Sequence, residues 1–223
     1  MTAQERWLEA IWPTVRAYLP PPPGVIVELG CGRLGGFVPE LLANGYDAVG
    51  VDPVAPDGDQ YLQVEFERAE LPAQLDGVVA CTSLHHVAEP GEVVDRIAQG
   101  LAPGGLVVVV EWDWEGLDEA TARWCFERLD ASATSSWLHH HRDRWEESGE
   151  PWEAYFRGWA EHHGLHPATQ LMRQLERRFE QVVLHRGPYY FSELAETSET
   201  DELAAIESGL IPAARIDYVG RLG

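Results

Sequence analysis

Lysine is absent from the 223 residues, because all 16 residues counted as Lys or Arg are arginine. Without lysine, the chain cannot form a Schiff base with pyridoxal phosphate or build a Walker-type phosphate loop. A general base must then be His, Asp, Glu, Tyr or Cys. The 37 acidic residues against 16 arginines give a net charge of −21. Because phosphate binding needs clustered cations, this balance argues against a nucleic-acid partner.

Cysteines and long apolar runs are also scarce. The three cysteines, Cys31, Cys81 and Cys125, are far apart and form no CxxC pair, which excludes a disulfide framework and a zinc pattern. No apolar run approaches the roughly 18 residues of a membrane span, so no membrane contact is expected. Residues 1–12 carry charge where a secretory signal needs an apolar core. A reducing, cytoplasmic location is therefore predicted.

Short apolar segments alternate with helical segments through the first half of the chain. Residues 3–19 have apolar side chains at helical spacing, and the prolines of 20–23 form a stiff linker after them. Apolar segments followed by turn residues predict strands at 24–30, 46–52, 61–66, 76–83 and 106–112, and helical patterns lie at 36–44 and 90–101. This alternation indicates an α/β fold with a parallel sheet covered on both faces.

The pattern changes near residue 115. Seven of the nine tryptophans lie between 112 and 159, and six of the nine histidines between 139 and 166. Pro151 can start a helix with an aromatic stripe. We expect one domain, 1–223, in four parts. They are an N-terminal helix with its proline linker (1–23), a cofactor-binding core (24–114), a helical lid inserted after the fifth strand (115–177), and C-terminal hairpin strands with an inserted helix (178–223).

A glycine-rich loop follows the first predicted strand. Gly30, Gly32 and Gly35 have the GxGxxG spacing, and Asp52 follows about twenty residues later, as in dinucleotide-binding motifs. Glycines at this point allow a tight turn and a close approach of the backbone to a ligand. The spacing alone also fits a glycine-rich turn without any ligand.

Three features favour S-adenosylmethionine over a nicotinamide cofactor. Glu28 stands two residues before the first glycine, where the dinucleotide motif is usually apolar, and an acid there can orient the loop and meet a cationic group. Asp52 ends the second predicted strand and suits a bidentate contact with ribose hydroxyls. Glu67 follows the third strand, where an acid can meet an adenine amino group. The later segments SLHHV (83–87) and LAPGG (101–105) also fit an S-adenosylmethionine site.

This ordered set of motifs resembles the class I S-adenosylmethionine-dependent methyltransferases, in the small-molecule group around ubiquinone and sugar methyltransferases. The resemblance covers residues 24–114 closely and 177–221 more loosely. It implies a Rossmann-like sheet, mostly parallel, with an antiparallel last strand. It also implies S-adenosyl-L-methionine as cofactor and S-adenosyl-L-homocysteine as product. The family's third motif usually carries Asp, where this chain has Glu67. The cofactor site that the resemblance implies comprises Glu28, Gly30, Cys31, Gly32, Asp52, Pro53, Glu67, Arg68, Cys81 and Thr82.

Methyl transfer is an in-line displacement, for which the protein supplies alignment and desolvation. A base is needed when the acceptor loses a proton, as a hydroxyl does. By similarity to sugar O-methyltransferases, His86 or His85 is the base and Glu111 orients it. This favours O-methylation of a small molecule, in biosynthesis, over N- or C-methylation. The alternative is that one of the two histidines caps a helix or has a packing role. The oligomeric state stays open between monomer and homodimer.

The aromatic residues of the second half allow two interpretations. Large rings can form the core of a small lid, or some can face a planar, sugar-bearing or cationic acceptor. The candidates for an acceptor-facing wall are Trp112, Trp114, Tyr189 and Tyr190.

The histidines and acids of the second half have plainer expected roles. Gly164 and Pro167 interrupt the helical spacing that a metal site would need, so the histidines are expected to be solvated, with no metal bound. The acidic tract 193–207 is expected to be a solvated helix face.

Two other functions fit parts of the sequence. A NAD(P)-dependent oxidoreductase would use the same glycine spacing, although Glu28 and the LHH segment disfavour it. A non-methylating protein on the same fold would bind the cofactor without forming S-adenosylhomocysteine.

Overall fold

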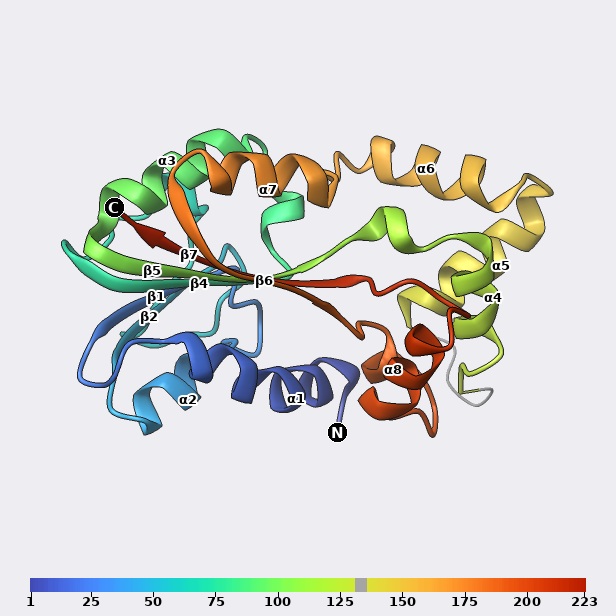
Figure 1. Cartoon of the computed structure of the whole chain (residues 1–223), viewed down its shortest axis with the longest axis horizontal. Coiled ribbons are helices and arrows are strands. Elements are labelled where there is room, and N and C mark those ends of the chain that lie inside the picture. The colour runs from blue at the N-terminus through green and yellow to red at the C-terminus, as the bar shows by residue number, and fades with distance from the viewer. Residues whose placement is uncertain (131–135) are drawn as a thin grey trace.

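The computed structural model describes residues 1–130 and 136–223, so residues 131–135 of the expected lid lie outside the described part. Within it, the centre is a seven-stranded sheet in the order β3-β2-β1-β4-β5-β7-β6 (Figure 1). Strands β1 to β5 are parallel, and β7 runs antiparallel between β5 and β6. The mixed Rossmann-like sheet is therefore confirmed. Its strands are β1 (Val25–Leu29), β2 (Asp47–Val51), β3 (Tyr61–Leu62), β4 (Leu75–Cys81), β5 (Leu101–Trp112), β6 (Phe179–Gly187) and β7 (Arg215–Leu222).

Helices cover both faces of the sheet. In Figure 1, α1 (Ala3–Tyr18) and α2 (Val38–Ala43) lie below it, and α3 (Pro90–Gly100) and α7 (Ala168–Glu176) lie above it. The buried side chains of each pair form a separate core with the strands. Burial on both faces explains why β1, β4 and β5 are largely apolar. The C-terminal edge of the parallel strands is left free for loops.

The first helix illustrates how local sequence sets an element. A capping box starts α1, because the Thr2 hydroxyl accepts the Glu5 N–H and the Glu5 carboxylate accepts the Thr2 N–H. Trp7, Ile11 and Val15 form its buried stripe, as the helical spacing predicts. The N-terminal turn of α1 contacts the single-turn 3-10 helix η4 (Phe191–Glu193), far away in the sequence.

Two strand boundaries differ from the prediction. The expected strand 61–66 shortens to β3, because at this sheet edge the Val64 N–H turns back to the carbonyl of Leu62. The chain then enters the 3-10 helix η1 (Phe66–Arg68). Strand β5 begins at Leu101, directly after α3, and pairs there with Leu75 of β4. The pairing resumes only between Gly77 and Leu106, so the Pro-Gly-Gly segment forms an irregularity within β5, with Gly104 at a φ of +78° as its turn signal predicts.

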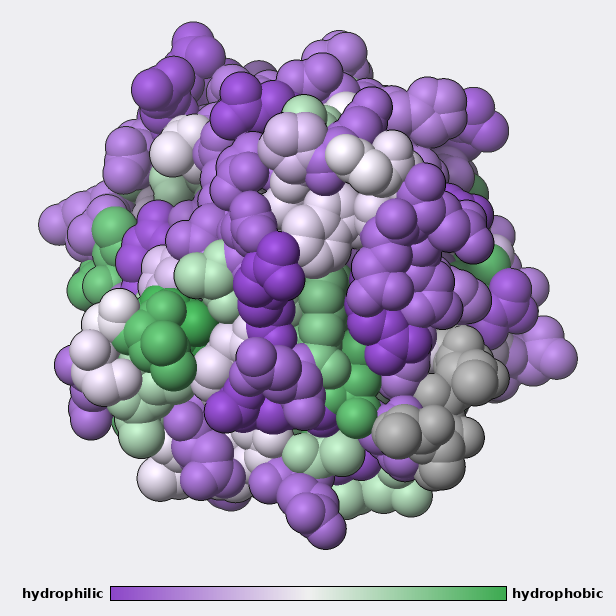
Figure 2. Space-filling view, turned by 90° about the vertical axis from the view of Figure 1, so that its right-hand side faces the viewer, coloured by the Kyte–Doolittle hydropathy of each residue, from purple (hydrophilic) through white to green (hydrophobic). Residues whose placement is uncertain are grey.

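Helices inserted between β5 and β6 gather at one end of the molecule. They are α4 (Glu119–Phe126), α5 (Trp137–Ser148) and α6 (Trp152–His162), and α8 (Glu199–Glu207) lies beside them (Figure 1). Their aromatic rings form a third core around Trp152 and Phe156. This end is mostly hydrophilic on its surface (Figure 2). Of the predicted lid segment, α7 packs instead against α3 and the sheet.

The expectation that the clustered histidines are solvated is wrong for two of them. His139 and His141 are both buried, and His141 packs against the rings of Trp152 and Phe156 in the third core. The Nδ1 of His141 lies 3.0 Å from the Tyr155 hydroxyl, and burial lowers the His141 pKa to about 4, so the ring is neutral. His140, His162 and His163 are exposed. In the described residues, no three of His, Cys, Asp and Glu gather as a metal site requires.

The acidic tract is also not wholly solvated. Glu202 of α8 is fully buried, and its carboxylate accepts the backbone N–H groups of Tyr189 (2.7 Å) and Phe191 (2.6 Å). Helical spacing alone could not show this, because the partners lie on a turn that only the tertiary fold brings near.

Across the described residues, no helix combines the length and apolar character that a membrane crossing needs. Single-turn 3-10 helices also occur at η2 (Leu84–His86) and η3 (Trp114–Gly116).

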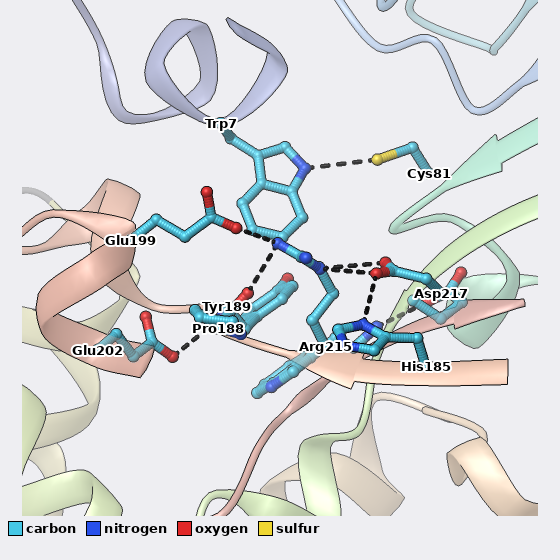
Figure 3. Close-up of polar contacts among 11 residues, drawn as sticks. Trp7, Cys81, His185, Pro188, Tyr189, Glu199, Glu202, Arg215 and Asp217 are labelled. Carbon is cyan, nitrogen blue, oxygen red and sulfur yellow. Dashed lines mark hydrogen bonds and ion pairs between the residues drawn. The ribbon is translucent and has the colours of Figure 1, made fainter. Parts of the chain in front are cut away.

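Arg215 of β7 connects α8 to the sheet (Figure 3). It is 5% exposed, with its Nε 3.0 Å from the buried Asp217 carboxylate and its Nη1 2.8 Å from the Glu199 carboxylate. The same Nη1 donates to the carbonyl of Pro188 at 3.3 Å. Together with Glu202, this network therefore positions the turn that carries Tyr189.

We predict that Arg215→Ala lowers the free energy of unfolding by about 3–5 kcal/mol, because the buried Asp217 carboxylate loses its arginine partner and keeps only the mostly exposed His185, 3.3 Å away. Urea denaturation measures the loss. The double substitution Arg215→Met with Asp217→Leu removes both charges and should be much closer to wild type. An unchanged unfolding midpoint for the single variant would contradict the assignment.

Candidate active site

The glycine loop turns sharply where β1 ends. Gly30 has a φ of +79°, and its N–H donates to the carbonyl of Val51 at 2.8 Å. A Cβ at Gly30 would lie 2.3 Å from the Cβ of Ser83, which follows β4. Only glycine allows the two loops to approach this closely. The loop after β1 thus lies directly against the loop after β4, as the motif predicts for a ligand site.

Asp52 joins the glycine loop to the end of β2. Its Oδ2 accepts the Gly32 N–H at 3.0 Å, and its Oδ1 accepts the Val54 N–H at 2.8 Å. The carboxylate therefore stabilises the loop and its own turn. It also lines a large cleft, so it is accessible to a ligand there.

That cleft has a volume of about 640 Å³ and lies at the carboxyl ends of β1, β2 and β4. Its size is within the range of cofactor pockets. Six of the ten predicted cofactor residues line it, namely Gly30, Asp52, Pro53, Glu67, Arg68 and Thr82. Sequence reasoning missed the contributions of Phe66 and Val87 and of Glu89 and Glu92 at the start of α3, because no motif spacing distinguishes them.

The other four predicted cofactor residues lie behind the cleft wall. Glu28 is buried under the loop, where its carboxylate accepts the Phe37 N–H at 2.7 Å. Burial raises the Glu28 pKa to about 8, although this backbone donor offsets part of the effect. Gly32 contributes through its bond to Asp52. Contact of these residues with the cofactor stays a prediction.

Cys31 and Cys81 are buried thiols. Burial raises the pKa of Cys31 to about 12, and it raises the pKa of Cys81 as well. Both are therefore protonated at neutral pH and are poor nucleophiles. The Sγ of Cys81 accepts the indole N–H of Trp7 at 3.4 Å, which links the end of β4 to α1.

Glu111, in β5, pairs with one of the two adjacent histidines. Its Oε2 lies 2.6 Å from Nδ1 of His85, and both side chains are buried. Its Oε1 accepts the backbone N–H groups of Ser83 (2.8 Å) and Leu84 (2.6 Å). Burial by itself would raise the Glu111 pKa, but His85 and the backbone N–H groups of Trp112 and Leu84 outweigh it and hold the pKa below its usual value. Glu111 thus orients His85 and the turn after β4.

His86 is the histidine that lines the cleft. Its ring centroid lies 4.0 Å from that of His85. Burial lowers the His86 pKa to about 4, and His85 adds to the effect. The ring is therefore neutral at physiological pH and offers an unprotonated nitrogen to the cleft. Of the two histidines between which the sequence left the choice open, His85 pairs with Glu111 and His86 lines the cleft.

A second cavity, of about 190 Å³, adjoins the cleft at Thr82, which lines both. Thr82 has a φ of +50°, an unusual conformation for a β-branched residue, and its N–H donates to the carbonyl of Val110 at 2.7 Å. Backbone strain of this kind concentrates at functional sites. The cavity is also lined by Gln4 and Trp7 of α1, Trp137 of α5, Tyr189 and Glu193.

Of the four predicted acceptor-facing aromatics, Tyr189 lines this cavity, whereas Trp112, Trp114 and Tyr190 line neither the cavity nor the cleft. Trp112 stacks on Tyr189 with ring centroids 5.5 Å apart, and its indole N–H donates to the Tyr190 hydroxyl at 3.1 Å. The indole of Trp114 donates to the carbonyl of His166. Sequence reasoning missed Trp7, because its helical spacing accounted for it as core.

Comparison with known families decides the class. A methyltransferase domain family matches residues 3–178. The chain belongs to this family. No curated protein matches the chain. Membership in the methyltransferase family favours the methyltransferase interpretation of the cleft over the oxidoreductase one.

Solved structures share the fold of this methyltransferase at low sequence identity. An S-adenosylmethionine-dependent methyltransferase from Mesorhizobium loti is 20% identical, covering 96% of this chain and 99% of the other, with a TM-score of 0.58. A geranyl diphosphate C-methyltransferase from Streptomyces coelicolor is 12% identical, covering 98% and 82%, with a TM-score of 0.55. A 1,6-didemethyltoxoflavin-N1-methyltransferase from Burkholderia thailandensis is 15% identical, covering 99% and 78%, with a TM-score of 0.53.

The buried Glu28 makes the stability of the methyltransferase depend on pH. Its pKa is about 8 in the folded state, against an ordinary glutamate pKa of 4.5. The folded state therefore holds more protons, and this group's contribution to stability falls as pH rises between those values. We predict that the free energy of unfolding of Glu28→Gln decreases less with rising pH than that of wild type. Urea denaturation across that pH range measures this. Glu40→Gln, an exposed change of equal charge on α2, should keep the wild-type slope. Equal slopes for wild type and Glu28→Gln would contradict this.

Proposed function

We propose that this methyltransferase transfers the methyl group of S-adenosylmethionine to a hydroxyl of a small-molecule acceptor. The observation that carries the proposal is the position of the neutral His86 in the wall of the cleft, close to the junction at Thr82. A cleft that ends beside a proton acceptor suits an acceptor that must lose a proton. The net charge of −21 favours a small molecule over a nucleic acid.

The residues of the cleft fit the cofactor. Gly30 allows the close backbone approach that a ligand at this loop needs, and a Cβ there would collide with Ser83. Asp52 offers a carboxylate for ribose hydroxyls, and Phe66 and Val87 offer an apolar surface for the adenine. S-adenosylmethionine supplies the electrophilic methyl group when bound.

The chain's own part in the reaction is to orient the acceptor and to remove its proton. His86 accepts the hydroxyl proton, because its ring is neutral and lines the cleft. The buried pair of Glu111 and His85 fixes the turn from which His86 projects. The three free, buried cysteines suit a reducing compartment, so we place the enzyme in the cytoplasm, in small-molecule biosynthesis.

We predict that Asp52→Ala weakens the binding of S-adenosylhomocysteine at least about tenfold, because hydrogen bonds to a charged acceptor are lost. Isothermal titration calorimetry measures the binding constant. Asp59→Ala, an exposed change of equal charge in the following loop, should bind like wild type. An unchanged binding constant for Asp52→Ala would place the ribose elsewhere.

His86→Ala should slow methyl transfer on the order of a hundredfold, as expected for loss of a general base, while S-adenosylhomocysteine binding stays within about twofold. The assay uses S-adenosylmethionine with a labelled methyl group and a panel of small alcohols and phenols, with mass spectrometry of the products. Because the His86 pKa is about 4, the wild-type rate should decline only as pH falls toward that value. Methylation of amines alone, unaffected by His86→Ala, would refute O-methylation by this base.

A further inference from the structure

The small cavity lies beside the glycine loop. It shares Thr82 with the cleft, and Gln4, which lines it, sits over the loop, since a Cβ at Gly32 would be 3.3 Å from the Gln4 amide nitrogen. A molecule in this cavity is therefore next to the part of the cleft lined by Gly30 and Thr82. This is the place that an acceptor must occupy if the proposed function holds.

Aromatic rings from three separate elements form its walls. They are Trp7 of α1, Trp137 of α5 and Tyr189, which follows β6. The rings of Trp7 and Tyr189 have centroids 4.9 Å apart, and Figure 3 shows both, with the Trp7 indole held by Cys81. Ring faces carry negative charge density, which attracts cations. Three aromatic rings therefore line a cavity that a cationic group of a small molecule can enter.

A carboxylate completes the cavity. Glu193 lines it and is half-buried, and burial raises the Glu193 pKa, although Arg6 and Trp137 offset part of this. The Arg6 guanidinium donates to the carbonyl of Ser192, with Nε at 3.0 Å. Among the described residues, Arg6 forms no ion pair with Glu193. Arg6 thus acts on Glu193 without an ion pair, because its guanidinium is engaged by the Ser192 carbonyl, and a cationic ligand in the cavity could contact the carboxylate directly.

We infer that the small cavity binds the acceptor through a positively charged amine, held between the three aromatic rings and the Glu193 carboxylate. The inference rests on the proposed function and names its substrate class, a small amine that also bears the hydroxyl to be methylated. The amine occupies the cavity, and the hydroxyl reaches past Thr82 toward His86. The strongly negative charge of the whole chain further favours a cation. Cavity size limits the bound part to about one or two rings.

The test uses three one-ring phenols that differ in charge. Tyramine is cationic, para-propylphenol is neutral, and para-hydroxyphenylpropionate is anionic. Binding to the full chain is measured by calorimetry after saturation with S-adenosylhomocysteine. Tyramine should bind about tenfold more tightly than the neutral phenol, the size expected for a partly desolvated cation among aromatic rings. The anionic phenol should bind most weakly.

Glu193→Gln should abolish most of the preference for tyramine and leave S-adenosylhomocysteine binding unchanged. The matched control is Glu207→Gln, an exposed change of equal charge at the end of α8, which should keep the preference. Thermal unfolding verifies that both variants are folded. Trp137→Leu should weaken tyramine binding more than para-propylphenol binding, because the ring face acts on the charge.

The outcomes separate this inference from the proposed function. If S-adenosylhomocysteine binds but the three phenols bind equally, or tyramine does not bind, the cationic acceptor is refuted and the methyltransferase site stands. If Glu193→Gln keeps the full preference for tyramine, the amine lies elsewhere and the inference fails. If S-adenosylhomocysteine itself does not bind, both are overturned.

Discussion

The carboxylate of Glu111 fixes the turn on which both cavities depend. It is fully buried in β5 and engages two backbone N–H groups of the turn after β4 together with His85. A carboxylate with so many donors holds its partners in one geometry. Thr82, at the start of this turn, borders both cavities, and His86, at its end, borders the cleft. The pairing with His85 thus positions the neighbouring ring rather than presenting His85 itself to the cleft.

A second carboxylate plays the corresponding role for the acceptor side. Glu202 of α8 accepts the N–H groups of Tyr189 and Phe191, and Arg215 ties α8 to β7 through Glu199. Tyr189 is then fixed between Trp7 and Trp112. The small cavity is therefore assembled from the first helix, the inserted helices and the C-terminal hairpin. Each of these elements is anchored by buried charge or aromatic packing, so the cavity is largely preformed.

Much of the cofactor side could be predicted from the sequence, because its signals are local. The glycine loop, Asp52 and the LHH segment each follow a strand, and the carboxyl ends of parallel strands meet at one edge of a sheet. Six of the ten predicted cofactor residues line the cleft. Glu28 lies buried beneath the glycine loop, and its predicted contact with the cofactor stays a prediction, because a motif does not encode how deeply a side chain is buried. The buried His141 and Glu202 were mistaken for solvated groups, because their partners are remote in the sequence.

The sequence by itself determined the class of sheet, the place of the glycine loop and the absence of any lysine base. These follow from the periodicity and spacing of neighbouring residues, which local physics interprets directly. The tertiary structure alone decided which histidine Glu111 engages, and that Trp7, Trp137 and Glu193 share one cavity beside Thr82. Glu111 lies in β5 and His85 follows β4, and the cavity joins the first helix to the inserted helices and the C-terminal part of the chain. Their proximity results from the packing of whole elements against the sheet, a long-range property that no local pattern of residues carries.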